Sequence, residues 1–110
     1  MDTKHTFCGF PAMRKRGGVI VNNASVQGQQ SAPLVTAYAA SKGGVLSLTR
    51  QLAIDYALQN IRVLAVCPGS IDTPLIRDAI SGDLGEVPDD MEAAIYAAGA
   101  RSPIARIGTP

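Results

Sequence analysis

The residues best suited to chemistry in this chain are Tyr38 and Lys42, which stand four positions apart in the stretch TAYAASKGG, residues 36–44. On a helix, residues four apart lie on the same face, about one turn from each other. A tyrosine has a pKa of about 10 in water, but a nearby ammonium and the positive end of a helix both favour its phenolate form. We therefore expect the phenol to exchange a proton with a hydroxyl or carbonyl oxygen.

A third polar side chain, Ser25, closes the strand-like run VIVNNAS thirteen residues before Tyr38. A hydroxyl at this point lies at the carboxyl edge of the predicted sheet, where open α/β folds bind their ligands. The sequence therefore predicts that a serine, a tyrosine and a lysine converge at one edge of a sheet.

The elements that must position these side chains form a βαβ unit. Val19–Ala24 and Ile61–Cys67 are short apolar runs typical of buried parallel strands. Between them, Thr36 is the expected N-cap of a helix that runs to about Asn60. Strands joined in this way are parallel, and their crossover is expected to be right-handed.

The long helix has two apolar stripes, so it needs two neighbours, one of which is its own sheet. Gly43 and Gly44 each weaken a helix interior, and we expect a close approach of backbone, substrate or cofactor there. The first stripe contains Val45, Leu48 and Leu52, and the second contains Leu46, Ala53, Tyr56 and Ala57.

Two segments near this unit, residues 4–16 and 26–35, are predicted to be a helix end and a loop. Residues 4–16 are predicted to end a helix that Pro11 kinks or shortens, and the cations at positions 14–16 suit the negative helix end better than a phosphate site. Gly17 is expected past the end of that helix. Residues 26–35 are polar, contain glycine and proline, and are predicted to be a loop across the mouth of the site.

Two short helices are predicted after Thr73, at Leu75–Ile80 and at Asp90–Ala100. Asp89 or Asp90 is interpreted as the N-cap of the second helix rather than as a catalytic carboxylate. The stretch SGDLGEVP between them is expected to be a loop.

Composition excludes several classes of function. A net charge of +1 provides no field for nucleic acid or a membrane surface, and no apolar run approaches the length of a membrane span. Cys8 and Cys67 are far apart and have no companion ligands, so we expect reduced thiols and no metal site. With no signal-peptide pattern at the start, the expected location is cytoplasmic.

The serine, tyrosine and lysine spacing, the preceding GGVIVN and the following CPGSIDTP at residues 67–74 together resemble the short-chain dehydrogenase/reductase family of nicotinamide-dependent oxidoreductases. The resemblance runs from about Pro11 to Pro110 and includes PIARIGTP at the end. It covers only the middle of the family's usual chain. It implies an α/β fold, with residues 1–110 forming a single partial domain of a Rossmann-like, doubly wound parallel sheet truncated at both ends.

The resemblance also implies the roles of the three polar residues. Tyr38 would exchange a proton with an alcohol or carbonyl substrate while hydride moves between substrate and nicotinamide. Lys42 would favour the phenolate and bind the nicotinamide ribose, and Ser25 would hold and polarise the substrate oxygen.

Further matches lie in the turn after the second strand. In the family this turn lies beside the nicotinamide of NAD or NADP, and the matching residues here are Pro68, Gly69, Ile71 and Thr73. The backbone near Ile71 would contact the carboxamide, and the Thr73 hydroxyl would contact the carboxamide or the phosphates. Loop 26–35 and the two later helices would shape the substrate pocket.

The family's glycine-rich phosphate loop, TGxxxGIG, does not occur in this sequence. The residue that selects NAD or NADP would lie in the same part of the family's chain. Two hypotheses follow. The chain is a fragment of an oxidoreductase that would form a homo-oligomer through the helix at residues 36–60, or it is a noncatalytic remnant that acts at most as an interaction module through that helix.

Overall fold

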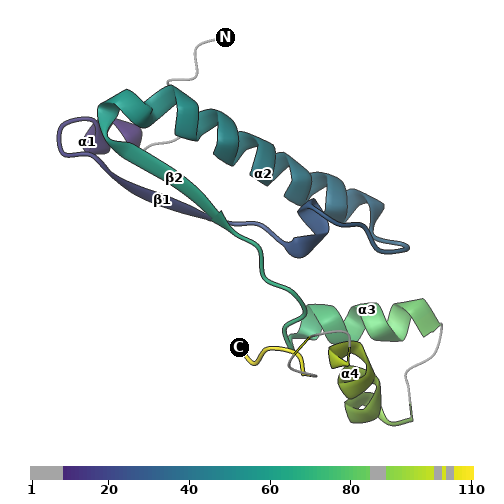
Figure 1. Cartoon of the computed structure of the whole chain (residues 1–110). Coiled ribbons are helices and arrows are strands. Elements are labelled where there is room, and N and C mark those ends of the chain that lie inside the picture. The colour runs from purple at the N-terminus through teal and green to yellow at the C-terminus, as the bar shows by residue number, and fades with distance from the viewer. Residues whose placement is uncertain (1–8, 85–88, 101–102, 104–105) are drawn as a thin grey trace. The chain divides into compact units, whose positions relative to one another are not determined.

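The computed structural model describes residues 9–84, 89–100, 103 and 106–110 (Figure 1). The chain divides into two compact units, one of residues 1–31 with 36–67 and the other of residues 32–35 with 68–110. The first unit contains the predicted βαβ arrangement, and the second contains the two later helices.

In the first unit, β1 (Gly18–Asn23) pairs in parallel with β2 (Ile61–Val66), and α2 (Thr36–Tyr56) connects them. The register runs from Gly18 opposite Ile61 to Asn23 opposite Val66. Both predicted strands and the helix between them are confirmed, with strand ends shifted by one residue. Thr36 is the first residue of the helix rather than the residue before it.

A single stripe of α2 is buried against the sheet, formed by Leu46, Thr49, Leu52 and Tyr56. Of the two predicted stripes, the chain itself buries Leu46, Leu52 and Tyr56 and leaves Leu48 exposed, so a second neighbour for α2 stays a prediction. The predicted stripes missed Thr49, which is buried. Thr49 tolerates burial because its hydroxyl donates to the Val45 carbonyl (2.7 Å) and accepts from the side-chain amide Nδ2 of Asn22 in β1 (2.9 Å). A polar residue satisfied in this way leaves no hydrophobic signal in the sequence.

The helix continues through a 3-10 turn, η3 (Ala57–Gln59), and ends at Asn60. Asn60 adopts the left-handed conformation (φ 55°), which asparagine tolerates better than most residues. Its carbonyl accepts a hydrogen bond from Gly18 (3.0 Å), so the end of the helix is tied to the start of β1.

The core of this unit lies between α2, one face of the sheet and the short helix α1 (Phe10–Met13). The rings of Phe10 and Tyr56 stack with their centroids 4.0 Å apart. The core residues are Phe10, Leu52, Tyr56, Ile61 and Val63.

Pro11 lies in the first turn of α1, where its missing N–H costs no helical hydrogen bond. The expected helix is therefore short, and Pro11 opens it instead of kinking it; residues 4–8 lie outside the described residues. Gly17 follows in the left-handed conformation (φ 73°), as expected for a glycine past a helix end.

The opposite face of the two-stranded sheet is apolar and exposed. Val19 and Val21 of β1 and Leu64 and Val66 of β2 retain 42–56% of their surface. Their register places all four on the same face. Parallel sheets in α/β proteins are normally covered on both faces, so this face is suited to packing against further structure.

The second unit contains α3 (Pro74–Leu84) and α4 (Met91–Gly99), which contact each other. The helix α3 is longer than the predicted Leu75–Ile80, since it continues through Ser81, whose hydroxyl donates to the Arg77 carbonyl (3.0 Å). Part of the expected loop SGDLGEVP is thus helical, and residues 85–88 lie outside the description.

Asp90 caps α4, as predicted, by accepting a hydrogen bond from the Ala93 amide (3.0 Å). The end of the chain returns to this unit, where Gly108 forms an isolated parallel bridge with Ile71. Gly99 permits this return because a Cβ at that position would lie 2.8 Å from the Ile107 nitrogen. Among the helices described, none has the length and apolar character needed to cross a bilayer.

Candidate active site

Tyr38 and Lys42 extend the buried stripe of α2. Tyr38, Lys42 and Leu46 are each four residues apart, so the two polar side chains lie on the face that packs on the sheet further along the helix. Tyr38 keeps 38% of its surface, and Lys42 is half-buried. The sheet-facing side of the helix therefore changes from a packing surface to a polar one toward its N-terminus.

Lys42 connects this end of the helix to the end of β1. Its ammonium Nζ donates to the carbonyl oxygen of Asn23 at 3.1 Å and lies 5.7 Å from the centroid of the Tyr38 ring. The hydrogen bond fixes the lysine at the carboxyl edge of the sheet, and the ring distance is within the range of a cation–π contact. The structure thus brings Lys42 and Tyr38 together, as the spacing predicts.

Ser25 follows β1 in extended conformation (φ −166°, ψ 156°) and is 6% exposed. Its Oγ accepts from the Gln27 amide at 3.2 Å and so caps the 3-10 turn η2 (Val26–Gly28). No described residue accepts a hydrogen bond from this hydroxyl, so its proton is available to an oxygen of a ligand. The serine is therefore held by its acceptor side and can donate.

The turn after Ser25 packs directly on α2 (Figure 1). A Cβ at Gly28 would lie 2.8 Å from the Lys42 carbonyl oxygen and 2.8 Å from a methyl carbon of Leu46. Only glycine allows this approach, so Gly28 sets how closely the segment after Ser25 packs against the turn of α2 that contains Lys42.

Of the close approaches expected at Gly43 and Gly44, that of backbone is seen only at Gly43 and is not tight, while an approach of substrate or cofactor stays a prediction. A Cβ at Gly44 would meet no atom within 4 Å, and at Gly43 it would meet only the Gly28 carbonyl oxygen at 3.7 Å. The glycine that packing requires is Gly28, which lies in the predicted loop. Glycine is common in loops, so nothing in the sequence indicates that this one is needed for packing.

The turn after β2 belongs to the second unit, so Pro68, Gly69, Ile71 and Thr73 are described apart from Ser25, Tyr38 and Lys42. Around Ile71, Gly108 donates to the Ser70 carbonyl (2.9 Å) and accepts from the Asp72 amide (2.9 Å). In such a parallel bridge the N–H and C=O of the central residue point away from the partner strand.

The exposed backbone pair of Ile71 fits the carboxamide of a nicotinamide. Within the described residues, its N–H has no partner and its carbonyl accepts only from the Thr73 hydroxyl, at 3.3 Å. One donor and one acceptor side by side match the oxygen and the NH₂ of a primary carboxamide. The residues present are therefore compatible with the cofactor that the sequence resemblance implies.

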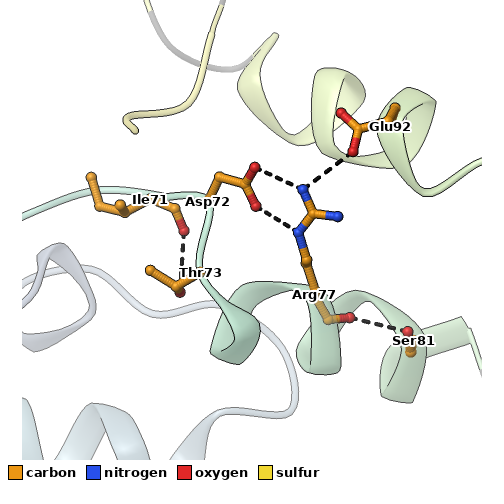
Figure 2. Close-up of polar contacts among 6 residues, drawn as sticks. All are labelled: Ile71, Asp72, Thr73, Arg77, Ser81 and Glu92. Atoms are coloured by element: carbon orange, nitrogen blue, oxygen red, sulfur yellow. Dashed lines mark hydrogen bonds and ion pairs between the residues drawn. The ribbon is translucent and has the colours of Figure 1, made fainter. Parts of the chain in front are cut away.

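An ion-pair cluster beside this turn was not anticipated from the sequence. Figure 2 shows Arg77 of α3 between Asp72 and Glu92 of α4. The guanidinium meets both oxygens of Asp72, at 2.7 Å and 2.8 Å, and its hydrogen bond to Asp72 holds the pKa of that carboxyl below its ordinary value. Asp72 and Glu92 lie five and fifteen residues from Arg77, and neither spacing is typical of an ion pair within one helix. The sequence therefore did not predict these contacts.

Cys67 is a half-buried free thiol whose Sγ lies 3.9 Å from the Gln29 side-chain nitrogen. Cys8 lies outside the described residues. Within the described part of the chain, no group of three or more His, Cys, Asp or Glu side chains is placed to hold a metal ion.

Comparison with known proteins identifies the family to which this arrangement corresponds. Residues 5–83 match the sequence profile of the family described as short chain dehydrogenase. A relative from Xanthobacter autotrophicus, named inactive 2-(S)-hydroxypropyl-CoM dehydrogenase 2, is 42% identical over 99 residues, which are 89% of this chain and 40% of that protein.

Solved structures match in the same proportion. The ligand-free aldohexose dehydrogenase of Thermoplasma acidophilum is 40% identical with a TM-score of 0.80, over 92% of this chain and 40% of that one. The L-sorbose reductase of Gluconobacter frateurii, solved with NADPH and L-sorbose, is 28% identical with a TM-score of 0.78, over 91% of this chain and 39% of that one. An NAD⁺-bound xylitol dehydrogenase is 29% identical with a TM-score of 0.75, over 88% of this chain and 40% of that one.

These matches place the observed α/β arrangement within the Rossmann-type fold of the family. The chain spans about 40% of the length of each of these four proteins.

The packing at Gly28 generates a prediction with a matched control. Gly28→Ala should lower the free energy of unfolding by about 1–3 kcal/mol, because the added methyl group meets backbone that cannot easily move. Gly44→Ala should raise it by up to about 1 kcal/mol, because that position is an open helix interior. Urea unfolding followed by circular dichroism measures both, and equal effects of the two substitutions would contradict the assigned contact.

Proposed function

The chain belongs to the short chain dehydrogenase family, and on that premise we propose that it carries the catalytic side of an oxidoreductase that interconverts an alcohol and a carbonyl compound. The observation that carries the proposal is the contact of Lys42 with both the Asn23 carbonyl and the Tyr38 ring. It joins an acid–base candidate and a cation at the sheet edge where α/β folds bind ligands.

Tyr38 acts as the acid and base. During alcohol oxidation its phenolate takes the hydroxyl proton as hydride leaves the carbinol carbon, and during carbonyl reduction its phenol returns a proton to the oxygen. Lys42 supports the phenolate through its positive charge, and Ser25 donates its free hydroxyl proton to the same substrate oxygen. When bound, NAD or NADP accepts or supplies the hydride.

The cofactor is proposed to be NAD or NADP, in keeping with the NADPH and NAD⁺ named for two related structures. Lys42 would bind its ribose. Ile71 would bind its carboxamide through its backbone N–H and C=O, Thr73 would contact the carboxamide or a phosphate, and Pro68 with Gly69 would shape the turn. Each of these residues offers a donor, an acceptor or a chain reversal of the kind that the contact needs.

We further propose that residues 1–110 form part of one Rossmann-type domain, because the chain matches about 40% of its relatives and one sheet face is left apolar. The sequence contains no glycine-rich loop to cradle a pyrophosphate. The helices α3 and α4 would cover a small alcohol or carbonyl substrate.

A second candidate function is pairing between copies of the chain, either in the enzyme or as the sole function of a noncatalytic remnant. Its support is the pair of apolar side chains Ile54 and Leu58 on α2 and η3, of which Ile54 keeps 74% and Leu58 all of its surface. An interface between two such helices would cover these side chains.

The acid–base role predicts a selective loss in Tyr38→Phe. The substitution should slow hydride transfer by about 10²–10⁴-fold, because the ring remains but no proton can be exchanged. The measurement supplies the chain with deuterium-labelled reduced cofactor and a panel of ketones and aldoses, and follows the label into alcohol products by mass spectrometry.

Tyr56→Phe is the matched control, since it removes the same hydroxyl from a buried core position on the same helix. Transfer at an unchanged rate in Tyr38→Phe, or an equal loss in both variants, would reject Tyr38 as the acid and base.

The pairing surface predicts that the chain self-associates and that Ile54→Glu weakens this association, because burying an unpaired carboxylate is unfavourable. Sedimentation velocity over a range of concentrations measures the effect. Leu75→Glu adds the same charge at an exposed apolar position of α3 and should leave the association unchanged. A monomer at every concentration would exclude this interface.

A further inference from the structure

Arg77 makes contacts that neither the packing of α3 nor the proposed chemistry requires. It lies in the first turn of α3 and holds Asp72 with two parallel hydrogen bonds, from Nε to Oδ1 (2.7 Å) and from Nη2 to Oδ2 (2.8 Å), as Figure 2 shows. The same Nη2 also donates to Oε1 of Glu92 in the first turn of α4 (3.2 Å). One guanidinium thus joins two segments.

The residue that Arg77 holds most tightly lies between the two proposed cofactor contacts. Asp72 separates Ile71 from Thr73, and its amide forms one of the two hydrogen bonds that bridge this turn to Gly108. Fixing the Asp72 side chain therefore restrains the backbone on both sides of it. It also restrains the direction in which the N–H and C=O of Ile71 point.

Helix α3 can begin without this ion pair. The Thr73 carbonyl already accepts hydrogen bonds from the Ile76 and Arg77 amides, both at 3.1 Å, and Pro74 suits the first helical position. The charged side chains are also partly exposed, by 28% at Asp72 and 38% at Arg77, so solvent weakens their contribution to overall stability. The effect of the pair should be local.

The two arms of Arg77 are unequal. The Asp72 arm is bidentate and short, a geometry that favours a guanidinium over an ammonium. The Glu92 arm is one longer contact to a side chain that is 78% exposed. The stronger contact is therefore the one that reaches the turn, and the contact with α4 is the weaker one.

We propose that Arg77 is a positioning residue that fixes the Ile71–Thr73 turn for a nicotinamide and ties to that turn the helix α4. The positioning part stands on the contacts of the free chain. Its link to a nicotinamide rests on the function proposed above. Arg77 itself touches neither substrate nor cofactor in this account.

Hydrogen exchange of backbone amides in the free chain tests the positioning. Arg77→Gln should lower the protection of the Gly108 and Asp72 amides by about threefold or more, while the unfolding midpoint of the chain changes little. Glu92→Ala is the matched control, since it removes only the acceptor on α4 and should leave both amides as in the parent chain. Arg77→Gln and Glu92→Ala should both loosen the Ala94 amide, which donates to the Asp90 carbonyl at the start of α4.

The variant Arg77→Lys tests whether the positive charge alone, without the two parallel hydrogen bonds, protects the Gly108 amide. Arg77→Lys keeps the positive charge but cannot make two parallel hydrogen bonds to one carboxylate, so Gly108 should stay as loose as in Arg77→Gln. Full protection of Gly108 in Arg77→Gln, or full rescue by lysine, would overturn the proposal.

The pH profile provides an independent readout. The hydrogen bond from Arg77 lowers the pKa of Asp72. The ion pair is therefore fully formed above the ordinary carboxyl pKa of about 3.9, and it is lost only as the pH falls through the lower pKa that Asp72 has in the folded chain. Gly108 protection in the parent chain should hold down to about pH 4 and fall below it. In Asp72→Asn it should be low throughout, and a profile identical to that of the parent would contradict the assigned contact.

Hydrogen exchange in the presence of a ligand tests whether the contacts of Arg77 respond to a nicotinamide. Reduced nicotinamide mononucleotide should raise the protection of the Ala94 amide in the parent chain but not in Arg77→Gln. If the mononucleotide binds and protects Ala94 equally in both, the tie to α4 is wrong. If it does not bind to the folded parent chain, the proposed function fails, while the exchange data of the free chain still decide the positioning role.

Discussion

The parallel pairing of β1 with β2 is the constraint on which the rest of the first unit depends. Parallel strands cannot be joined by a tight turn, so the chain must return along a helix, and α2 spans that distance in 21 residues. The return brings the N-terminus of the helix to the carboxyl ends of both strands. Lys42 then donates to the Asn23 carbonyl, and Tyr38 lies one turn nearer the N-terminus of the helix. The polar site is thus a consequence of the strand direction.

Much of this could be predicted from local sequence because each feature has a local cause. The apolar runs at residues 19–24 and 61–67 set the strands, and the four-residue spacing of Tyr38 and Lys42 set their shared face. Asp90 was recognisable as a cap because a short polar side chain precedes an apolar helix. Strand formation and helix caps follow from rules that act over a few residues, and the parallel pairing of the strands follows from the helix that connects them.

The features that escaped prediction depend on contacts between distant segments. Gly28 resembles any loop glycine until α2 packs against it, and Thr49 resembles a surface residue until Asn22 provides its hydrogen bond. Arg77 finds Glu92 only because α3 and α4 pack together. The exposed apolar face of the sheet shows the same limit, since nothing in the strands themselves says what covers them.

We propose that this chain carries the nicotinamide side of an oxidoreductase, and its sequence contains no glycine-rich loop to hold the pyrophosphate. Titration of the folded chain with NADH, NADPH and reduced nicotinamide mononucleotide, followed by nicotinamide fluorescence, tests it most directly. The account predicts saturable binding of all three with similar affinities, because the adenosine half of the dinucleotides has no glycine-rich loop to hold it. A folded chain that binds none of them would contradict the claim, and a dinucleotide bound far more tightly than the mononucleotide would show that the chain holds the pyrophosphate by other means.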